Sequence, residues 1–216
     1  MMGLGTFILE LVAPIMELIE PMLPGEIFPY FFIMGMFHRA MLAAILVTIV
    51  SGILGCFLLV RNLALMGDGL AHVSFGGVAI GVVLGAAAPL WYALVCSLIA
   101  AILIHEMQTR EILTGDASIA IFLTGMLALG LVILRVFGGG ITTDIEGYLF
   151  GNLLLIDEES LDLIALISIF SFILLVVMRS ILLASTIDPL AARVQGIPVR
   201  GIGLMFSVIT AAVVVS

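Results

Sequence analysis

The stretch from residue 69 to residue 104, GLAHVSFGGVAIGVVLGAAAPLWYALVCSLIAAILI, contains no Asp, Glu, Lys or Arg. A helix needs about 20 apolar residues to cross a bilayer, so this stretch is too long for a single crossing. The sequence GAAAPLW around Pro89 offers a turn near its middle. The stretch therefore predicts two membrane-spanning helices, at residues 67–86 and 89–106.

The composition of the whole chain is also that of a membrane protein. Its 216 residues are 63% hydrophobic and 10% charged, with a mean hydropathy of +1.40, which leaves too little polar surface for a soluble domain. The lengths of the apolar runs favour helices over the ~10-residue alternating strands of a membrane barrel. All 7 basic residues are arginines, and no basic nucleic-acid-binding surface is indicated. The predicted fold class is all-α, a polytopic helical membrane protein.

Further apolar runs raise the expected number of transmembrane helices to about six. They cover residues 40–60, 117–135 and 161–181, and a last run ends at Ser216. A polar loop is expected at 183–200. Because the run after Arg200 is short for a crossing, we expect the chain to be truncated at its C-terminus.

Residues 1–36 are expected to form an N-terminal segment, interfacial or extracellular, ahead of a transmembrane domain at 37–216. Four prolines interrupt any long helix there, and four glutamates are spread among apolar residues. The arginines favour cytoplasmic loops at Arg61, Arg110 and 179–200, with Arg39 and Arg135 opposing this orientation. The expected location is the plasma or inner membrane, crossed several times.

Asp68 and His72 stand out because charge is scarce in this part of the chain. Residues four apart share one helix face, so the pair can present an oxygen and a nitrogen to one metal ion. In the alternative interpretation, Asp68 is the N-cap of a helix starting near Gly69, and His72 makes an ordinary interhelical hydrogen bond. Downstream, Gly77, Gly81 and Gly85 form a stripe of small residues that predicts close helix packing.

The sequence DPLAARVQGIPVR, residues 188–200, predicts a short isolated helix. Asp188 suits the N-cap and Pro189 the first helical position. Gly196 suits the left-handed position after the helix, and Pro198 prevents continuation. Its apolar face, formed by Leu190, Ala191 and Val194, could rest on lipid or dock into a soluble partner.

Three motifs in this order resemble the membrane-spanning permease subunits of ABC (ATP-binding cassette) importers for zinc, manganese and iron. They are RNLALMGDGLAHVSFGG, YLFGNLL and IDPLAARVQGIPVR, and the resemblance runs from about Phe37 to the C-terminus. The family's first motif usually reads G-D-A-[LI]-S-H and then L-P-G. This chain keeps Gly67, Asp68 and His72 and has FGG in place of L-P-G.

The resemblance implies a path for a divalent metal. Asp68 and His72 match the family's metal-contacting Asp and His, and Asp144 matches an acid just before the second motif. Some members carry a His three residues after that acid, where this chain has Gly147 with Glu146 beside it. The implied ligand set is Asp68, His72, Asp144 and Glu146, and its oxygen-rich character suits Mn²⁺ or Fe²⁺ somewhat better than Zn²⁺. The metal is cargo, and no permanently bound cofactor is expected.

The third motif is similar to the family's coupling helix, which seats in a groove of the cytoplasmic ABC ATPase. This likeness implies coupling roles for Asp188, Pro189, Ala192, Gly196 and Val199. The implied partners are that ATPase subunit, an extracellular metal-binding protein, a second permease copy in a homodimer, and the lipid bilayer.

The function we expect is that of a permease subunit in an ATP-driven importer of divalent metal ions, with ATP hydrolysed by a separate subunit. The permease itself is then not an enzyme. An alternative is an ion-coupled secondary metal transporter, in which Asp68 is a protonatable carboxylate. That alternative gives no reason for the capped loop. An intramembrane metalloenzyme needs a completed metal site with a general base, and the three histidines form no H-E-x-x-H motif.

Overall fold

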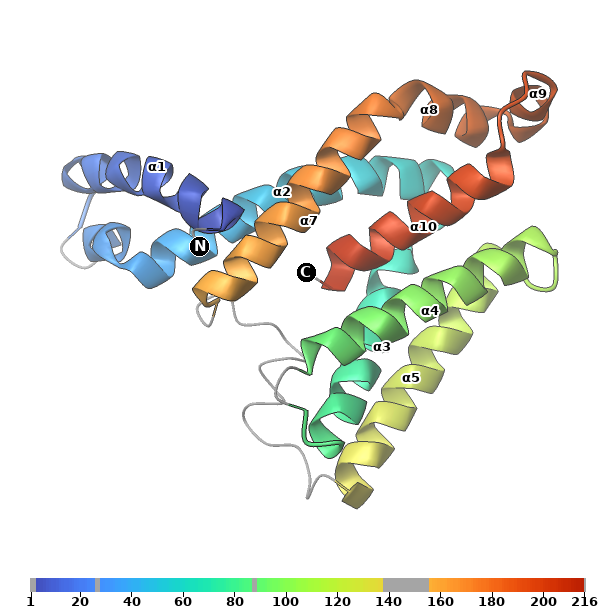
Figure 1. Cartoon of the computed structure of the whole chain (residues 1–216), viewed down its shortest axis with the longest axis horizontal. Helices are drawn as coiled ribbons and strands as arrows, with labels where there is room; N and C mark the ends of the chain where they lie inside the picture. Colours follow the sequence, from blue (N-terminus) through green and yellow to red (C-terminus); the bar gives the residue numbers. More distant parts are fainter. Residues whose placement is uncertain (1–2, 26–27, 87–88, 138–155, 216) are drawn as a thin grey trace. The chain divides into compact units, whose positions relative to one another are not determined.

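A computed structural model of the chain consists of helices joined mostly by short connections (Figure 1). It describes residues 3–25, 28–86, 89–137 and 156–215. Five helices are long and apolar enough to cross a membrane: α2 (Gly35–Val60), α3 (Met66–Val83), α4 (Leu90–Thr109), α5 (Gly115–Phe137) and α7 (Glu158–Val177). The others are α1 (Leu4–Ile19), η1 (Glu20–Met22), η2 (Phe28–Ile33), α8 (Arg179–Ile187), α9 (Pro189–Val194) and the apolar α10 (Val199–Val215). No strand occurs within these ranges, and the predicted helical membrane fold is confirmed.

The predicted spans fall on helices, but some boundaries differ: the expected span 161–181 covers most of α7, which ends at Val177, and the start of α8. The expected span 67–86 ends at Val83, because Gly85 takes a left-handed φ of +70° that stops the helix. The polar loop expected at 183–200 starts later than predicted, because α8 continues to Ile187, and α9 inside it is the short helix that the sequence predicts. Ser185 and Thr186, two polar residues near the end of α8, each accept a hydrogen bond from Arg61 through their hydroxyl oxygens.

The chain divides into two units, and each is described by itself. The first comprises residues 1–51 and 152–173, and the second comprises residues 52–151 and 174–215. In the first unit, Leu42 and Ala43 of α2 pack against Leu161 and Ile164 of α7. Arg39 is used in this packing, because its Nε donates to the Ile156 carbonyl at 2.9 Å.

Helix α1 belongs to the first unit and contains Pro14 in its interior. The expectation that the prolines interrupt any long helix is therefore wrong for this one. The start of the helix is held by α7: the Thr6 N–H donates to Asp162 Oδ1 at 2.7 Å, and Gly5 lies against the Leu161 carbonyl. The hydrogen bond to Asp162 satisfies an N–H group of the first turn that has no partner within the helix, and this offsets part of the free-energy cost of Pro14.

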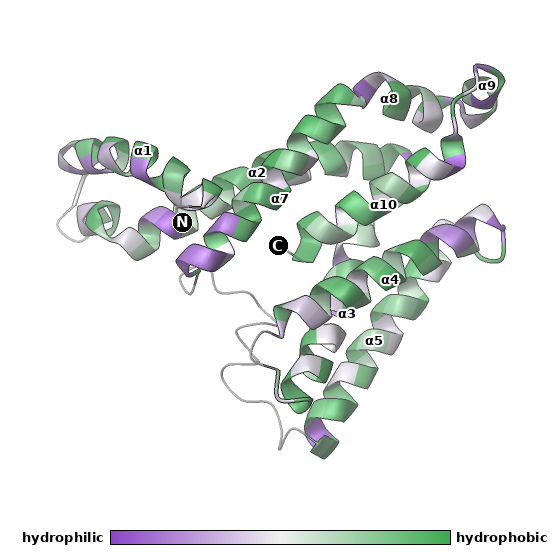
Figure 2. Cartoon of the chain, in the orientation of Figure 1, coloured by the Kyte–Doolittle hydropathy of each residue, from purple (hydrophilic) through white to green (hydrophobic). Residues whose placement is uncertain are grey.

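Helix α3 is the centre of the second unit and packs against α4, α5 and α10 (Figure 1). Met66, Leu70 and Phe75 are completely or almost completely buried along it. Polar residues gather near several helix ends, as at the end of α4 and the start of α7 (Figure 2). The hydrophobic effect does not drive association of surfaces already in lipid, so close packing must hold α3 in place.

The glycines of α3 provide that close packing. A Cβ added at Gly77 would lie 2.7 Å from Ala93 Cα, and one at Gly81 would lie 3.0 Å from Pro89 Cα. The predicted packing role is thus confirmed for Gly77 and Gly81. It is wrong for Gly85, which has nothing within 4 Å and serves the turn after the helix.

Candidate functional site

Asp68 and His72 lie near the start of α3, on a side left open by its neighbours. The Asp68 side chain is 66% exposed and that of His72 is 29% exposed. The helix begins at Met66 with Leu65 as its N-cap, so the alternative that Asp68 caps the helix is wrong. Asp68 occupies the first turn instead, where its negative charge interacts favourably with the helix dipole.

The two side chains point toward one another across one helical turn. His72 Nε2 and Asp68 Oδ1 are 3.6 Å apart, which is too long for a hydrogen bond. Two bonds of about 2.1 Å to one ion place their ligand atoms about 3.0 Å apart at 90° and about 3.4 Å apart at 109°. A shift of a few tenths of an ångström would bring both atoms to one cation, and the open side leaves room for further ligands.

The other two implied metal ligands, Asp144 and Glu146, lie outside the described residues. Within the ranges that are described, no group of three or more His, Cys, Asp or Glu side chains is arranged to hold a metal. The structure therefore shows one pair of the implied ligand set, and the full set stays a prediction.

Helix α9 is capped at both ends as the sequence predicts. Asp188 Oδ1 accepts from the N–H groups of Leu190 and Ala191 at 3.0 and 2.9 Å. At the other end Gly196 has a φ of +83°. Its N–H and that of Ile197 donate to the carbonyls of the last turn, forming a Schellman motif.

Helix α9 exposes two large apolar side chains. Leu190 is 73% exposed and Val194 is 89% exposed, whereas Ala192 is buried. A six-residue helix held by its own caps keeps its shape without packing over most of its surface. It can therefore offer these apolar side chains to a partner without refolding.

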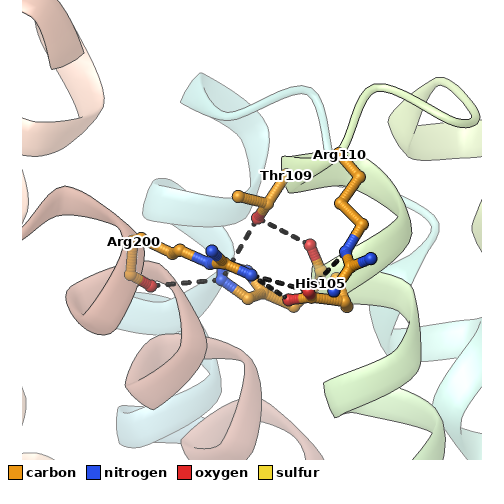
Figure 3. Close-up of polar contacts among 5 residues, drawn as sticks. His105, Thr109, Arg110 and Arg200 are labelled. Carbon is orange, nitrogen blue, oxygen red and sulfur yellow. Dashed lines mark hydrogen bonds and ion pairs between the residues drawn. The ribbon is translucent and has the colours of Figure 1, made fainter.

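A cluster of charged residues joins the end of α4 to the start of α10 (Figure 3). Arg200 Nη2 donates to both carboxylate oxygens of Glu106, at 2.6 and 2.7 Å. Arg110 Nε donates to Glu106 Oε1 at 2.6 Å. His105 Nε2 lies 3.1 Å from the Arg200 carbonyl oxygen, and Thr109 donates to the His105 carbonyl at 2.7 Å. Such charge-assisted bonds are short and strong.

A second cluster lies around Arg61, which joins the end of α2 to α8, the helix that precedes α9. Its Nε donates to Thr186 Oγ1 at 2.9 Å and its Nη2 to Ser185 Oγ at 3.0 Å. Its guanidinium carbon lies 4.7 Å from the centre of the Phe206 ring, a cation–π contact. Burial lowers the pKa of Arg61 from its ordinary value, although an arginine still stays protonated.

The sequence alone did not identify these two clusters. The i,i+4 spacing of Glu106 and Arg110 is a local signal for an ion pair, but the expected span ended at residue 106 and Arg110 was placed in a loop. Arg200 lies 94 residues from Glu106, and Arg61 lies 125 residues from Thr186. No local pattern reports contacts over such separations.

Comparison with known proteins places these features in a family. The model of the ABC 3 transport family matches residues 34–216. The chain belongs to the ABC 3 transport family. The resemblance to metal ABC permeases is confirmed, and the chain is a multi-pass membrane protein.

Several relatives of the ABC 3 chain have names that refer to manganese. It is 34% identical over 180 residues to the manganese transport system membrane protein MntC of Halalkalibacterium halodurans, covering 83% of this chain and 61% of the relative. It is 31% identical over 163 residues to the manganese import system permease protein ScaB of Streptococcus parasanguinis, covering 76% and 57%. The chain thus spans about three fifths of the length of these relatives.

A solved structure supports the fold. The structure titled PsaBC from Streptococcus pneumoniae in complex with Fab superposes with a TM-score of 0.68 at 31% identity. The match covers 83% of this chain and 64% of that one. The helical arrangement described above is therefore similar to one that occurs in an experimental structure.

Proposed function

We propose that this chain acts in the permease subunit of an ATP-driven importer of divalent metal ions, with Mn²⁺ as the first candidate among manganese, iron and zinc. The observation that carries the proposal is the Asp68–His72 pair, an unclosed acid–imidazole pair on an open side of a transmembrane helix. Ionisable groups inside membrane spans are costly and mark ion pathways. Family membership and the names of the relatives support the same function.

In this proposal Asp68 and His72 contact the metal in transit, together with Asp144 and Glu146. Three carboxylates and one imidazole make a donor set in which oxygen predominates. Carboxylate oxygen suits Mn²⁺, whereas Zn²⁺ is bound as readily by nitrogen and sulfur. Uptake assays with competing Fe²⁺ and Zn²⁺ test this order of preference.

Helix α9 is the proposed contact with a cytoplasmic ABC ATPase, which hydrolyses the ATP. Asp188, Pro189, Ala192, Gly196 and Val199 shape this contact through the caps and the buried side of the helix. We propose further that an extracellular metal-binding protein delivers the ion and that two permease copies form a homodimer. The permease itself then breaks no covalent bond.

The experiment that tests this function is purification of the full-length protein from its own membranes in mild detergent, with mass spectrometry of what accompanies it. We expect an ATP-binding cassette subunit to copurify. Leu190→Asp places a charge on the exposed face of α9 and should release that subunit. Ile112→Asp, at an exposed apolar residue between α4 and α5, is the matched control and should retain it.

The result also separates the alternative function. If no ATPase accompanies the wild-type protein, and if metal uptake by cells stops when the proton gradient is collapsed, the protein is an ion-coupled secondary transporter. ATP-dependent uptake that survives collapse of the gradient supports the importer.

For residues 1–36 we propose an interfacial position at the outer membrane surface, ahead of the transmembrane domain at 37–216. Phe7, Leu11 and Leu18 are 56%, 60% and 73% exposed on one side of α1. Three glutamates in or just after the same helix make a position in the bilayer core costly. Quenching of a tryptophan placed at Leu11, in a Trp91→Phe background, by lipids labelled near the headgroup tests this position.

A further inference from the structure

The connection between α9 and α10 is short, and the N–H groups of Gly196, Ile197 and Val199 are all hydrogen-bonded. The Gly196 and Ile197 N–H groups close the end of α9 on the carbonyls of Arg193 and Ala192, each at 3.0 Å. Pro198 follows, and its carbonyl accepts from the Ile202 N–H at 3.0 Å as α10 begins. Because these hydrogen bonds hold the connection in one conformation, we expect a movement of α9 to move the first turn of α10 with it.

The first turn of α10 is in turn fixed to the end of α4. Arg200 is held by both oxygens of Glu106, and its carbonyl lies against His105 (Figure 3). One turn further on, a Cβ at Gly203 would lie only 2.7 Å from His105 Cε1, so the two helices are in close contact there. The ion pair therefore acts where the packing already brings the helices together.

Helix α4 continues this contact toward the candidate metal pair. It packs on α3 through Gly77 and Ala93, and α3 carries Asp68 and His72. The second unit thus contains an unbroken series of contacts from α9 through α10 and α4 to α3. Among the described residues, the Glu106–Arg200 pair is the one ion pair between helices of that series.

We propose that Glu106 is a positioning residue that couples α9 to the metal path, by holding the first turn of α10 to α4. This inference rests on the proposed function, since it assigns to α9 the ATPase contact. In this proposal Glu106 acts through α10 and α4 and is not itself a contact of the metal or the ATPase. Its role is to make α4 follow when α9 moves.

Arg110 provides a matched control within the same cluster. It binds the same carboxylate as Arg200 but belongs to the α4 end of the contact, four residues from Glu106. Arg110→Gln removes a charge and a bond to Glu106 and leaves the α4–α10 link intact. Glu106→Gln and Arg200→Gln each break that link.

The test uses the complex with its copurified ATPase, reconstituted in liposomes, with Mn²⁺ imported and ATP hydrolysed measured in the same vesicles. In Glu106→Gln and Arg200→Gln we expect the Mn²⁺ imported per ATP to fall about two- to thirtyfold, the range typical of variants along a coupling route. The ATPase should still copurify. The double variant should fall no further than either single one, because the residues act through one bond. Arg110→Gln should match the wild type.

A merely structural role would lower import and hydrolysis together and leave their ratio unchanged, and that result overturns the proposal. An equal loss of coupling in Arg110→Gln overturns it too. Absence of ATP-dependent Mn²⁺ uptake by the wild type is a different outcome, because it contradicts the proposed function itself.

A second measurement does not depend on transport. Amide hydrogen exchange of residues 197–203 in the purified protein should be about two- to thirtyfold faster in Glu106→Gln than in Arg110→Gln. Equal exchange in the two variants means that Glu106 does not hold this connection, and the inference then falls whatever the protein transports.

Discussion

The second unit contains two acid–base pairs with the same i,i+4 spacing and opposite character. Glu106 and Arg110 are joined by a bond of 2.6 Å, and Arg200 binds the same carboxylate. Asp68 and His72 stand 3.6 Å apart, and Asp68 is mostly exposed. The two pairs differ in their surroundings. The Glu106 carboxylate binds a second arginine, Arg200, whereas no third side chain among the described residues is shown bound to Asp68 and His72, so this pair can accept a cation. Spacing along a helix predicts that two side chains can meet, and the neighbouring helix decides what they do.

The open pair lies on a rigid base. Below it, Leu70 and Val73 are completely or almost completely buried, and Gly77 allows α3 to touch α4 backbone to backbone. Side chains that bind and release an ion work best on a helix that is already held in place, because no free energy is then spent on ordering the helix at each binding event.

The largest expected effect follows from breaking the open pair. Asp68→Asn and His72→Gln should each reduce Mn²⁺ uptake to background, because each removes a proposed metal contact. Thermal stability should hardly change, since the two side chains lie 3.6 Å apart and neither makes a short bond to another described residue. Asp116→Asn, the same change in the first turn of α5, is the control and should transport normally. Normal uptake by both pair variants would remove these residues from the metal path.

A smaller effect is expected from disturbing the base. Gly77→Ala places a Cβ 2.7 Å from the Ala93 Cα and should lower the free energy of unfolding by about 1–3 kcal/mol through overpacking. Gly125→Ala, in α5 with nothing within 4 Å, should instead raise it by about 1 kcal/mol through helix propensity. Unfolding of both variants in mixed micelles measures the difference. Two equal effects would show that α3 and α4 are not closely packed.

The smallest effect concerns a carboxylate that accepts its hydrogen bond from the first turn of the helix that follows it. Asp157 precedes α7, and the Ser160 N–H donates to its Oδ1 at 2.8 Å. Hydrogen bonds from the hydroxyl and the N–H of Ser160 hold the pKa of Asp157 below its ordinary value of 3.8. Asp157→Ala should cost about 1 kcal/mol at pH 7, as loss of an N-cap does.

The pH dependence of that cost checks its origin. A lowered folded-state pKa stabilises the fold above the ordinary value, and the contribution is lost as the pH falls through the lowered pKa. The stability difference between wild type and Asp157→Ala should therefore shrink below about pH 4. Glu159→Ala, in the same first turn, is the control. A difference that is constant with pH would mean that the carboxylate charge is not involved.

The parts that the sequence predicted are those that depend on local rules. Spans follow from the length of uncharged runs, and the ends of α9 follow from Asp188, Pro189 and Gly196. The shared face of Asp68 and His72 follows from helical period alone. Their open position does not, because it depends on which residues α4, α5 and α10 bury. Glu106 with Arg200, and Arg61 with Thr186, were missed for the same reason.

The capping of α1 by Asp162 has a consequence for the order of assembly. The Thr6 N–H and Asp162 are 156 residues apart in the chain, so the ribosome makes the helix long before it makes the cap. When residues 3–19 first meet the membrane, their binding site on α7 does not yet exist. Four other spanning helices, α2 to α5, are synthesised in between. Capping of α1 by Asp162 is therefore a late step of biogenesis, and a chain stalled before α7 lacks this hydrogen bond.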